Sequence, residues 1–288
     1  MDTIFQTVAI VGPGLVGGSL GMALRRQGLA GRVIGIGRRE RSLREALDRG
    51  AVDEVTLDPA RGVREADLTV LATPIGAFER LLPAVAEGMK RGTLLSEVAS
   101  AKQGVIRTAS GALAHRPDVA FIPTHPMAGS ERRGASHAAA DMFEGSVCIF
   151  TPLEGTPDAA LDALRRMWEG VGATVRLMDP ADHDRLVARI SHLPHLAAAA
   201  LMDMVTPDEA AFAGGGLTDT TRVASGDPKL WRDICEFNAE QIAFALEAYR
   251  ARMQSIRALL TEGRYDELEE VLRRAKSKRD ELLDNRGN

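Results

Sequence analysis

The chain is 288 residues long, which is enough for about two domains that each bury a hydrophobic core. Hydrophobic residues make up 45% and charged residues 26% of it, and the net charge is -4. This composition is typical of a soluble globular protein, and the interleaved basic and acidic residues at 264–279 argue against a nucleic-acid partner. Glycines and a proline interrupt the apolar N-terminal stretch TVAIVGPGLVGG, so we expect no signal peptide, no membrane anchor and a cytoplasmic location.

Short runs rich in Val, Ile and Leu alternate with amphipathic stretches from Thr7 to Met178. Helical patterns such as LGMALRRQG and IRTASGALAH lie between several of these runs. The alternation predicts parallel βαβ units, and hence an α/β, Rossmann-type, doubly wound sheet in a dinucleotide-binding domain at 1–179. The expected strands are TVAIVG, RVIGIG, LTVLAT, TLLSEV, AFIPTH, SVCIFT and ATVRLM.

The motif GPGLVGGS follows the first expected strand and begins a helix. Its glycines have the GxGxxG spacing, which permits a tight turn, close approach of a pyrophosphate to the backbone, and close packing of the helix on the strand. The free amides at the helix N-terminus would face the phosphates. We therefore expect a dinucleotide to bind here, and the expected cofactor contacts are Gly12, Gly14, Leu15, Val16, Gly17 and, at the end of LTVLAT, Thr73.

Two arginines follow the second expected strand, which ends in GIGRR. Folds that prefer NAD usually carry an acidic residue about 20 residues after the glycines, where it binds the ribose hydroxyls. Arg38 and Arg39 could instead bind a 2′-phosphate; alternatively, they are ordinary surface arginines of an enzyme that uses NAD. The sequence favours NADP as the cofactor and leaves NAD possible.

The segment EVASAK follows the expected strand TLLSEV. Ligands of a doubly wound sheet gather at the carboxyl ends of its strands, so we expect Ser100 and Lys102 at that rim. Ser100 could alternatively be only the N-cap of the next helix.

The segment PTHPMAGSE completes the strand that begins with AFI. A residue before a proline is pushed into extended geometry, so His125 should end this strand rather than enter a helix. Gly129 permits a close turn that brings Glu131 back to the same corner. Taken alone, this pattern also fits a turn that merely contains a histidine.

The character of the sequence changes after Asp179 and Pro180. Asp227 and Pro228 are typical of an N-cap and a first helical residue. We expect an all-α domain over 180–288, because three stretches with helical periodicity follow: HDRLVARISHLPHLAAAALMDMV, LWRDICEFNAEQIAFALEAYRARMQSIRALL and YDELEEVLRRAKSKRDELL.

The sequence SHLPHL places His192 and His195 on one face of a helix that Pro194 must kink or interrupt. No carboxylate stands at a spacing such as HExxH, so hydrogen bonding by these histidines is the better interpretation. The cysteines, Cys148 and Cys235, also lack metal-binding spacing. We expect two buried thiols and no metal site.

The stretch LTDTTRVASGDPKLW follows three glycines and is expected to form a turn and a helix start that carry Asp219, Arg222 and Trp231. An arginine there suits bidentate binding of a carboxylate. The alternative is a structural ion pair between Asp219 and Arg222.

An apolar stripe at spacings of three and four runs along the longest helical stretch. Packing within the domain accounts for part of it, and we expect the rest to form a two-fold homodimer through the C-terminal helices. The residues of the stripe are Ile242, Leu246, Tyr249, Met253, Ile256 and Leu260.

Taken in order, GPGLVGGS, VASAK, HPMAGSE, SHLPH and TDTTRVASGDPKLWRDI resemble the prephenate/arogenate dehydrogenase family of tyrosine biosynthesis. The resemblance covers nearly the whole chain, and its last three motifs are specific. It implies a Rossmann domain followed by a helical substrate-binding and dimerisation domain, with the active site in the cleft between them. The chain stops after the expected helical domain, so we expect neither a chorismate mutase fusion nor a regulatory ACT domain.

The resemblance assigns roles by position. His125 is similar to the family's catalytic histidine, which bonds the C4 hydroxyl of the substrate, and Ser100 to the serine that contacts this hydroxyl and the nicotinamide. Arg222 matches the arginine that holds the ring carboxylate. We also expect His195 to be catalytic, and the remaining matches imply substrate-binding roles for His192, Glu131, Trp231 and Asp219. An unperturbed imidazole would make activity rise with pH through about 6.5, because the base must be neutral.

The implied reaction is oxidative decarboxylation of prephenate to 4-hydroxyphenylpyruvate with hydride transfer to NAD(P). Arogenate, or both substrates as in a cyclohexadienyl dehydrogenase, is the alternative, and Arg133 departs from the small or short polar residue of many relatives. A β-hydroxyacid dehydrogenase would use a lysine where this chain has helix histidines. A non-catalytic dinucleotide sensor is disfavoured because His125, Arg222 and Ser100 are all present.

Overall fold

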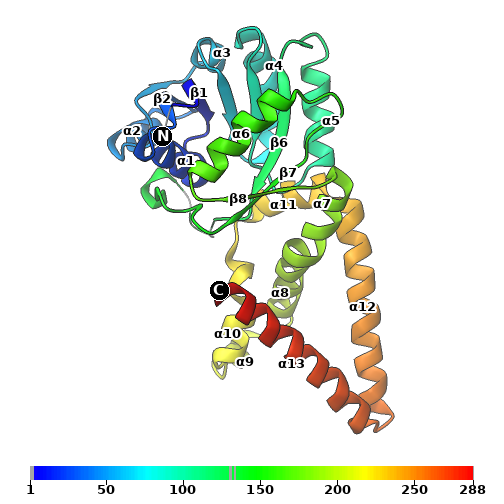
Figure 1. Cartoon of the computed structure of the whole chain (residues 1–288). Coiled ribbons are helices and arrows are strands. Elements are labelled where there is room, and N and C mark those ends of the chain that lie inside the picture. The colour runs from blue at the N-terminus through cyan, green and yellow to red at the C-terminus, as the bar shows by residue number, and fades with distance from the viewer. Residues whose placement is uncertain (1–2, 130–131, 133, 288) are drawn as a thin grey trace. The chain divides into compact units, whose positions relative to one another are not determined.

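The computed structural model describes residues 3–129, 132 and 134–287. Within them, eight strands form one sheet in the order β3-β2-β1-β4-β5-β6-β7-β8 (Figure 1). The strands are β1 (Phe5–Val11), β2 (Ala30–Ile36), β3 (Glu54–Thr56), β4 (Leu68–Leu71), β5 (Leu94–Glu97), β6 (Ala120–Pro126), β7 (Val147–Phe150) and β8 (Thr174–Leu177).

Helices connect these strands and make up the rest of the regular structure. Before residue 179 they are α1 (Leu15–Arg26), α2 (Glu40–Asp48), α3 (Pro59–Val63), α4 (Phe78–Gly88), α5 (Gln103–Ala112) and α6 (Asp158–Gly170), with the 3-10 turns η1 (Ile75–Ala77) and η2 (Ala135–His137). After it they are α7 (Pro180–Val187), α8 (Leu193–Asp203), α9 (Pro207–Ala210), α10 (Gly215–Thr221), α11 (Pro228–Phe237), α12 (Ala239–Thr261) and α13 (Tyr265–Gly287). A π-helical turn, η3 (Ala188–His192), and a 3-10 turn, η4 (Arg222–Ser225), lie among them.

Strands β1 to β6 pair in parallel, and β1 has β2 on one side and β4 on the other. The expected doubly wound, Rossmann-type sheet is therefore confirmed. The prediction missed β3, because this edge strand has three residues and no apolar run. It was wrong for β7, which pairs antiparallel to β6, since the described part of their connection holds the short turn η2 rather than a crossover α-helix.

Alternate residues of β1 point to opposite faces of the sheet. Val8 and Ile10 belong to a core that includes residues of α1 and α6, whereas Ala9 and Val11 belong to a second core with residues of α3, α4 and α5. Figure 1 shows α6 crossing one face of the sheet. The sheet is thus buried on both faces, as expected for continuous apolar strands.

The described residues from 180 to 287 form helices and turns, as predicted for this half of the chain. The side chain of Asp227 caps α11 by accepting hydrogen bonds from the amides of Lys229 and Leu230, which confirms the predicted N-cap. Pro194 lies in the first turn of α8, directly after the π-helical turn η3. The expected interruption before this proline is therefore present.

By packing, the chain divides into two compact units, residues 1–239 and 240–288. Helices α7 to α11 thus belong to the same compact unit as the sheet, while the domain boundary near 179 stays a prediction. In the second unit, α12 leaves Leu246, Tyr249, Met253 and Leu260 exposed, whereas Ile242 is buried. The exposed members of the stripe are available for an interface.

Within the described residues, none of the helices is long and apolar enough to cross a membrane. The same residues contain no group of three or more His, Cys, Asp or Glu side chains that could hold a metal ion. Cys148 is buried as expected, whereas Cys235 is only partly buried.

Candidate functional site

The carboxyl ends of the parallel strands bring most of the predicted residues of the first half to one edge of the sheet. Ligands bind at this edge in doubly wound folds. The glycine loop follows β1, Arg38 and Arg39 follow β2, Thr73 follows β4, and Ser100 follows β5. His125 is the penultimate residue of β6.

The glycine loop has the geometry that a pyrophosphate requires. Gly12 has a φ of 94°, and a Cβ there would lie 2.9 Å from the backbone of Ala72. A Cβ on Gly17 would lie 2.4 Å from the carbonyl oxygen of Gly12, so this position must also be glycine. A Cβ on Gly14, the N-cap of α1, would meet open space. The loop is thus closed towards the protein and open towards a ligand, and its residues fit a dinucleotide.

Leu15, Val16 and Thr73 adjoin this loop. The first two begin α1, whose N-terminal turn, LVGG, is apolar and presents backbone amides. The hydroxyl of Thr73 is buried and has no hydrogen-bond partner among the described residues. An unpaired buried hydroxyl is costly, so this group also fits a bound cofactor.

Arg38 and Arg39 are both exposed at the end of β2, where Arg39 is the N-cap residue of α2. Their position is compatible with contact to the adenosine ribose and its substituent. It does not distinguish NADP from NAD.

A buried ion pair holds the strand end that carries His125. Nζ of Lys102 donates to Oε1 of Glu97 and, at 2.6 Å, to the carbonyl oxygen of Thr124, and all three residues are fully buried. The Thr124 hydroxyl donates to the carbonyl oxygen of Glu97 at 2.6 Å. Burial raises the pKa of Glu97 and lowers that of Lys102, so each group depends on its partner. The network ties β5 to β6 directly before His125, although Lys102 is buried beneath the expected rim rather than exposed at it.

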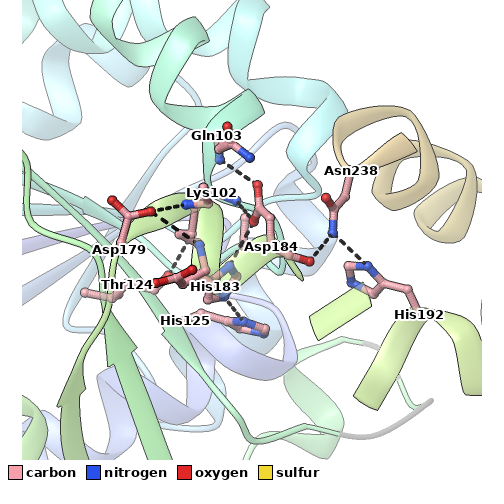
Figure 2. Close-up of polar contacts among 12 residues, drawn as sticks. Lys102, Gln103, Thr124, His125, Asp179, His183, Asp184, His192 and Asn238 are labelled. Carbon is pink, nitrogen blue, oxygen red and sulfur yellow. Dashed lines mark hydrogen bonds and ion pairs between the residues drawn. The ribbon is translucent and has the colours of Figure 1, made fainter. Parts of the chain in front are cut away.

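His125 is hydrogen-bonded to a second histidine, which is bonded to an aspartate (Figure 2). Nδ1 of His125 lies 2.8 Å from Nε2 of His183, and Nδ1 of His183 lies 2.9 Å from Oδ1 of Asp184. A carboxylate only accepts hydrogen bonds, so His183 donates to Asp184 through Nδ1. Its Nε2 must then accept from Nδ1 of His125. These two hydrogen bonds leave Nε2 of a neutral His125 with a free lone pair, as a general base requires.

Asp184 has a second task, because it also caps α5. Its Oδ1 accepts from the amide of Lys102 at 2.7 Å and its Oδ2 from the amide of Gln103 at 2.9 Å. Lys102 is the N-cap residue of α5, so the alternative interpretation of Ser100 as the N-cap is wrong. A carboxylate from α7 replaces a local cap, and Ser100 lies in the partly buried loop before it.

His125 and His183, the two hydrogen-bonded histidines, are both neutral near pH 7. Burial lowers the pKa of His125 well below the ordinary value of 6.5, and charge on His183, Lys102 and His192 would lower it further. Burial also lowers the pKa of His183, against the opposing effect of its hydrogen bond to Asp184. The assumption of an unperturbed imidazole, on which the expected rise of activity through pH 6.5 was based, is therefore wrong. The acidic limb should lie at lower pH.

His192 and His195 lie around Trp231, and all three belong to the first unit. His195 stacks on Trp231 with centroids 3.5 Å apart, and His192 approaches its ring edge-on at 6.0 Å. A Cβ on Gly226 would lie 2.4 Å from Nε1 of Trp231, so glycine makes room for the stack. Nε2 of His192 and Nδ1 of His195 are buried without hydrogen-bond partners in the described part of the chain. Such nitrogens are suited to a polar ligand.

Asp219, Arg222 and Glu131 are the remaining predicted site residues. Asp219 is exposed within α10, so the segment that directly follows the three glycines is helical rather than the expected turn. Arg222 is exposed at the start of η4. Glu131 and Arg133 lie outside the described residues.

His183, Asp184 and Asn238 do not stand out in the sequence. Adjacent His and Asp residues in a polar helical stretch are typical of a solvated face, yet both are fully buried. Asn238, which is 4% exposed, ends α11 inside what the sequence presents as one long helix. The available signal was the Asp179-Pro180 helix start, which places His183 and Asp184 at the junction between the sheet and the helical half.

Two family models match the chain. The model described as the nucleotide-binding domain of prephenate dehydrogenase matches residues 20–177, and the model described as its dimerization domain matches residues 179–274. The prephenate dehydrogenase of Bacillus subtilis (strain 168) is 32% identical over 289 residues, which cover 98% of this chain and 77% of that protein.

Solved structures of two similar proteins superimpose over nearly the whole chain. One is the prephenate dehydrogenase of Aquifex aeolicus in complex with hydroxyphenyl propionate and NAD+, with a TM-score of 0.90, 33% identity, and coverage of 96% of this chain and 98% of that chain. The other is the arogenate dehydrogenase of Synechocystis, with a TM-score of 0.82, 30% identity, and coverage of 96% and 100%.

Proposed function

We propose that this chain, which belongs to the prephenate dehydrogenase family, oxidatively decarboxylates prephenate to 4-hydroxyphenylpyruvate. The observation that supports this activity best is the chain from His125 through His183 to Asp184. It holds a neutral imidazole at the edge of the sheet where a dinucleotide fold binds its ligands. A base at that edge can take a hydroxyl proton while the same carbon is oxidised.

In the proposed reaction, Nε2 of His125 accepts the proton of the substrate's C4 hydroxyl. The proton gives His125 a positive charge, and the His183 link to Asp184 stabilises that charge by strengthening both hydrogen bonds. Ser100 contacts the same hydroxyl, and Arg222 holds the ring carboxylate until its bond to the ring breaks and carbon dioxide leaves. The electron pair of that bond enters the ring as a hydride leaves C4, and the proton held by His125 returns to the C4 oxygen. The product is then a phenol, and aromatisation supplies the driving force.

A nicotinamide dinucleotide supplies the hydride acceptor of this reaction when it is bound. Gly12, Gly14 and Gly17 would hold its pyrophosphate, and Thr73 would offer its unpaired hydroxyl. We further propose that the enzyme prefers NADP, because Arg38 and Arg39 can bind a 2′-phosphate. NAD remains the alternative cofactor.

Arogenate is the alternative substrate, since the similar proteins include both a prephenate and an arogenate dehydrogenase. The two substrates differ only in a side-chain amine. Arg133 departs from the pattern of many relatives, and this position is a reason to test both substrates.

We also propose a cytoplasmic homodimer with a helical domain over 180–288. The match to a dimerization-domain model supports it, and so do the exposed apolar residues Leu246, Tyr249, Met253 and Leu260 on α12.

Initial rates with prephenate and arogenate, each against NAD and NADP, test these proposals together. We expect the largest kcat/KM for prephenate with NADP. A larger value with arogenate would replace the substrate, a larger value with NAD would replace the cofactor, and inactivity in all four assays would refute the activity.

A further inference from the structure

Asn238 connects Asp184, which orients His125 through His183, to His192, which lies against Trp231. Its Nδ2 lies 2.9 Å from the carbonyl oxygen of Asp184 and 3.2 Å from Nδ1 of His192 (Figure 2). Asn238 is 4% exposed, and His192 and Asp184 are fully buried. Water therefore cannot readily replace either contact.

The hydrogen-bond partners fix the orientation of the amide and, through it, the protonation of His192. A backbone carbonyl only accepts, so the atom of Asn238 that faces Asp184 is the NH2 nitrogen. Its second hydrogen is directed to Nδ1 of His192, which must accept. A neutral His192 then carries its proton on Nε2.

His192 is neutral in the folded protein. Burial is the main cause that lowers its pKa from 6.5 to about 4, and charge on His183 and His195 adds to the effect. The Nε2–H group is buried and has no acceptor among the residues that the structure describes. Within the described residues this donor therefore lacks an acceptor, and charge on His192 would lower the pKa of His125.

We propose that Asn238 is a positioning residue that holds His192 in its Nε2–H tautomer, so that His192 donates a hydrogen bond to a carboxylate or carbonyl oxygen of the substrate. This inference rests on the proposed function for the identity of the substrate, but not for the tautomer. Asp184 sets the tautomers of His125 and His192. Its side chain acts through His183 and leaves Nε2 of His125 as an acceptor. Its backbone oxygen acts through Asn238 and leaves Nε2 of His192 as a donor. One residue of α7 thus sets two imidazoles in opposite roles.

The tautomer can be measured without a substrate. In wild-type protein with 15N-labelled histidine, two-dimensional NMR at pH 7.5 should show His192 protonated on Nε2, with the signal assigned by its loss in His192→Asn. In Asn238→Asp the carboxylate can only accept, so the proton should move to Nδ1. A wild-type His192 protonated on Nδ1 would overturn the inference, even if the variant failed to fold.

Steady-state kinetics test the contact with the substrate. Asn238→Asp should raise the KM for prephenate about 10- to 100-fold, the effect of one lost buried hydrogen bond, and should leave the KM for the cofactor within a few-fold. Glu236→Gln, an exposed change on the same helix, is the matched control and should leave both values unchanged.

An unchanged KM for prephenate in Asn238→Asp would overturn the donor role of His192. Failure of wild-type protein to act on prephenate or arogenate would refute the proposed function, whereas the NMR measurement would still decide for or against the tautomer.

Discussion

Replacing His192 with Asn should make the stability of the protein less sensitive to acid. His192 is fully buried, and its pKa is about 4 in the folded chain against 6.5 for an ordinary imidazole. As the pH falls through 6.5, the unfolded chain binds a proton that the folded chain does not. Stability is therefore complete above pH 6.5 and is lost as the pH falls towards 4.

The size of this effect follows from the two pKa values. Between pH 7.5 and 5.5, one such histidine lowers the free energy of unfolding by about 1.4 kcal/mol, and below the folded pKa by about 3 kcal/mol in all. Asn does not titrate, so His192→Asn removes this part of the pH dependence. The loss of the bond to Asn238 adds an offset that is the same at both pH values.

Urea unfolding at pH 7.5 and pH 5.5, followed by tryptophan fluorescence, measures the difference. The wild type should lose about 1.4 kcal/mol more than His192→Asn between the two pH values. His115→Asn, at an exposed histidine, is the control and should follow the wild type. Equal losses in wild type and His192→Asn would show that His192 is not held neutral by burial.

Three further changes test the catalytic and binding roles. Asp184→Asn should lower kcat about 100- to 10,000-fold, because an amide cannot accept all three of the hydrogen bonds that the carboxylate accepts. The control Asp182→Asn, on the exposed side of α7, should leave kcat unchanged, and a kcat within a few-fold of wild type for Asp184→Asn would contradict the role of Asp184 in orienting His125 through His183. Replacing Arg38 and Arg39 with Ala should weaken NADP binding by about 1.5 to 3 kcal/mol relative to NAD binding, and tighter binding of NAD than of NADP by the wild type would argue against this role. Arg222→Lys keeps the charge but loses the planar fork, so the KM for prephenate should rise steeply while the KM for the cofactor stays nearly constant; an unchanged KM for prephenate would remove Arg222 from the substrate site.

The sequence was sufficient for the parallel core of the fold, because its strands are buried on both faces and read as continuous apolar runs. It was insufficient for β3 and β7. The three residues of β3 carry little pattern, and the direction of β7 depends on whether its connection to β6 crosses the sheet. Neither property is local.

The same limit applies to the site. Gly12 and His125 were recognisable because a local motif or a neighbouring proline determines their geometry. Asp184 and Asn238 act through partners far away in the chain: Asp184 caps a helix 81 residues earlier, and Asn238 bonds a residue 54 positions earlier. Such long-range hydrogen bonds leave no periodic signal, so the residues that orient the histidines appear only in the structure.

The most direct test of the proposed function is the reaction of prephenate at pH 7.5 in wild-type protein and in His125→Asn, with the preferred cofactor saturating. The wild type should form 4-hydroxyphenylpyruvate and reduced cofactor in equal amounts, and His125→Asn should lower kcat about 100- to 10,000-fold while it still binds the cofactor. A variant within a few-fold of wild-type activity, or a wild type that forms no 4-hydroxyphenylpyruvate, would contradict the proposed function and the role of His125 as its base.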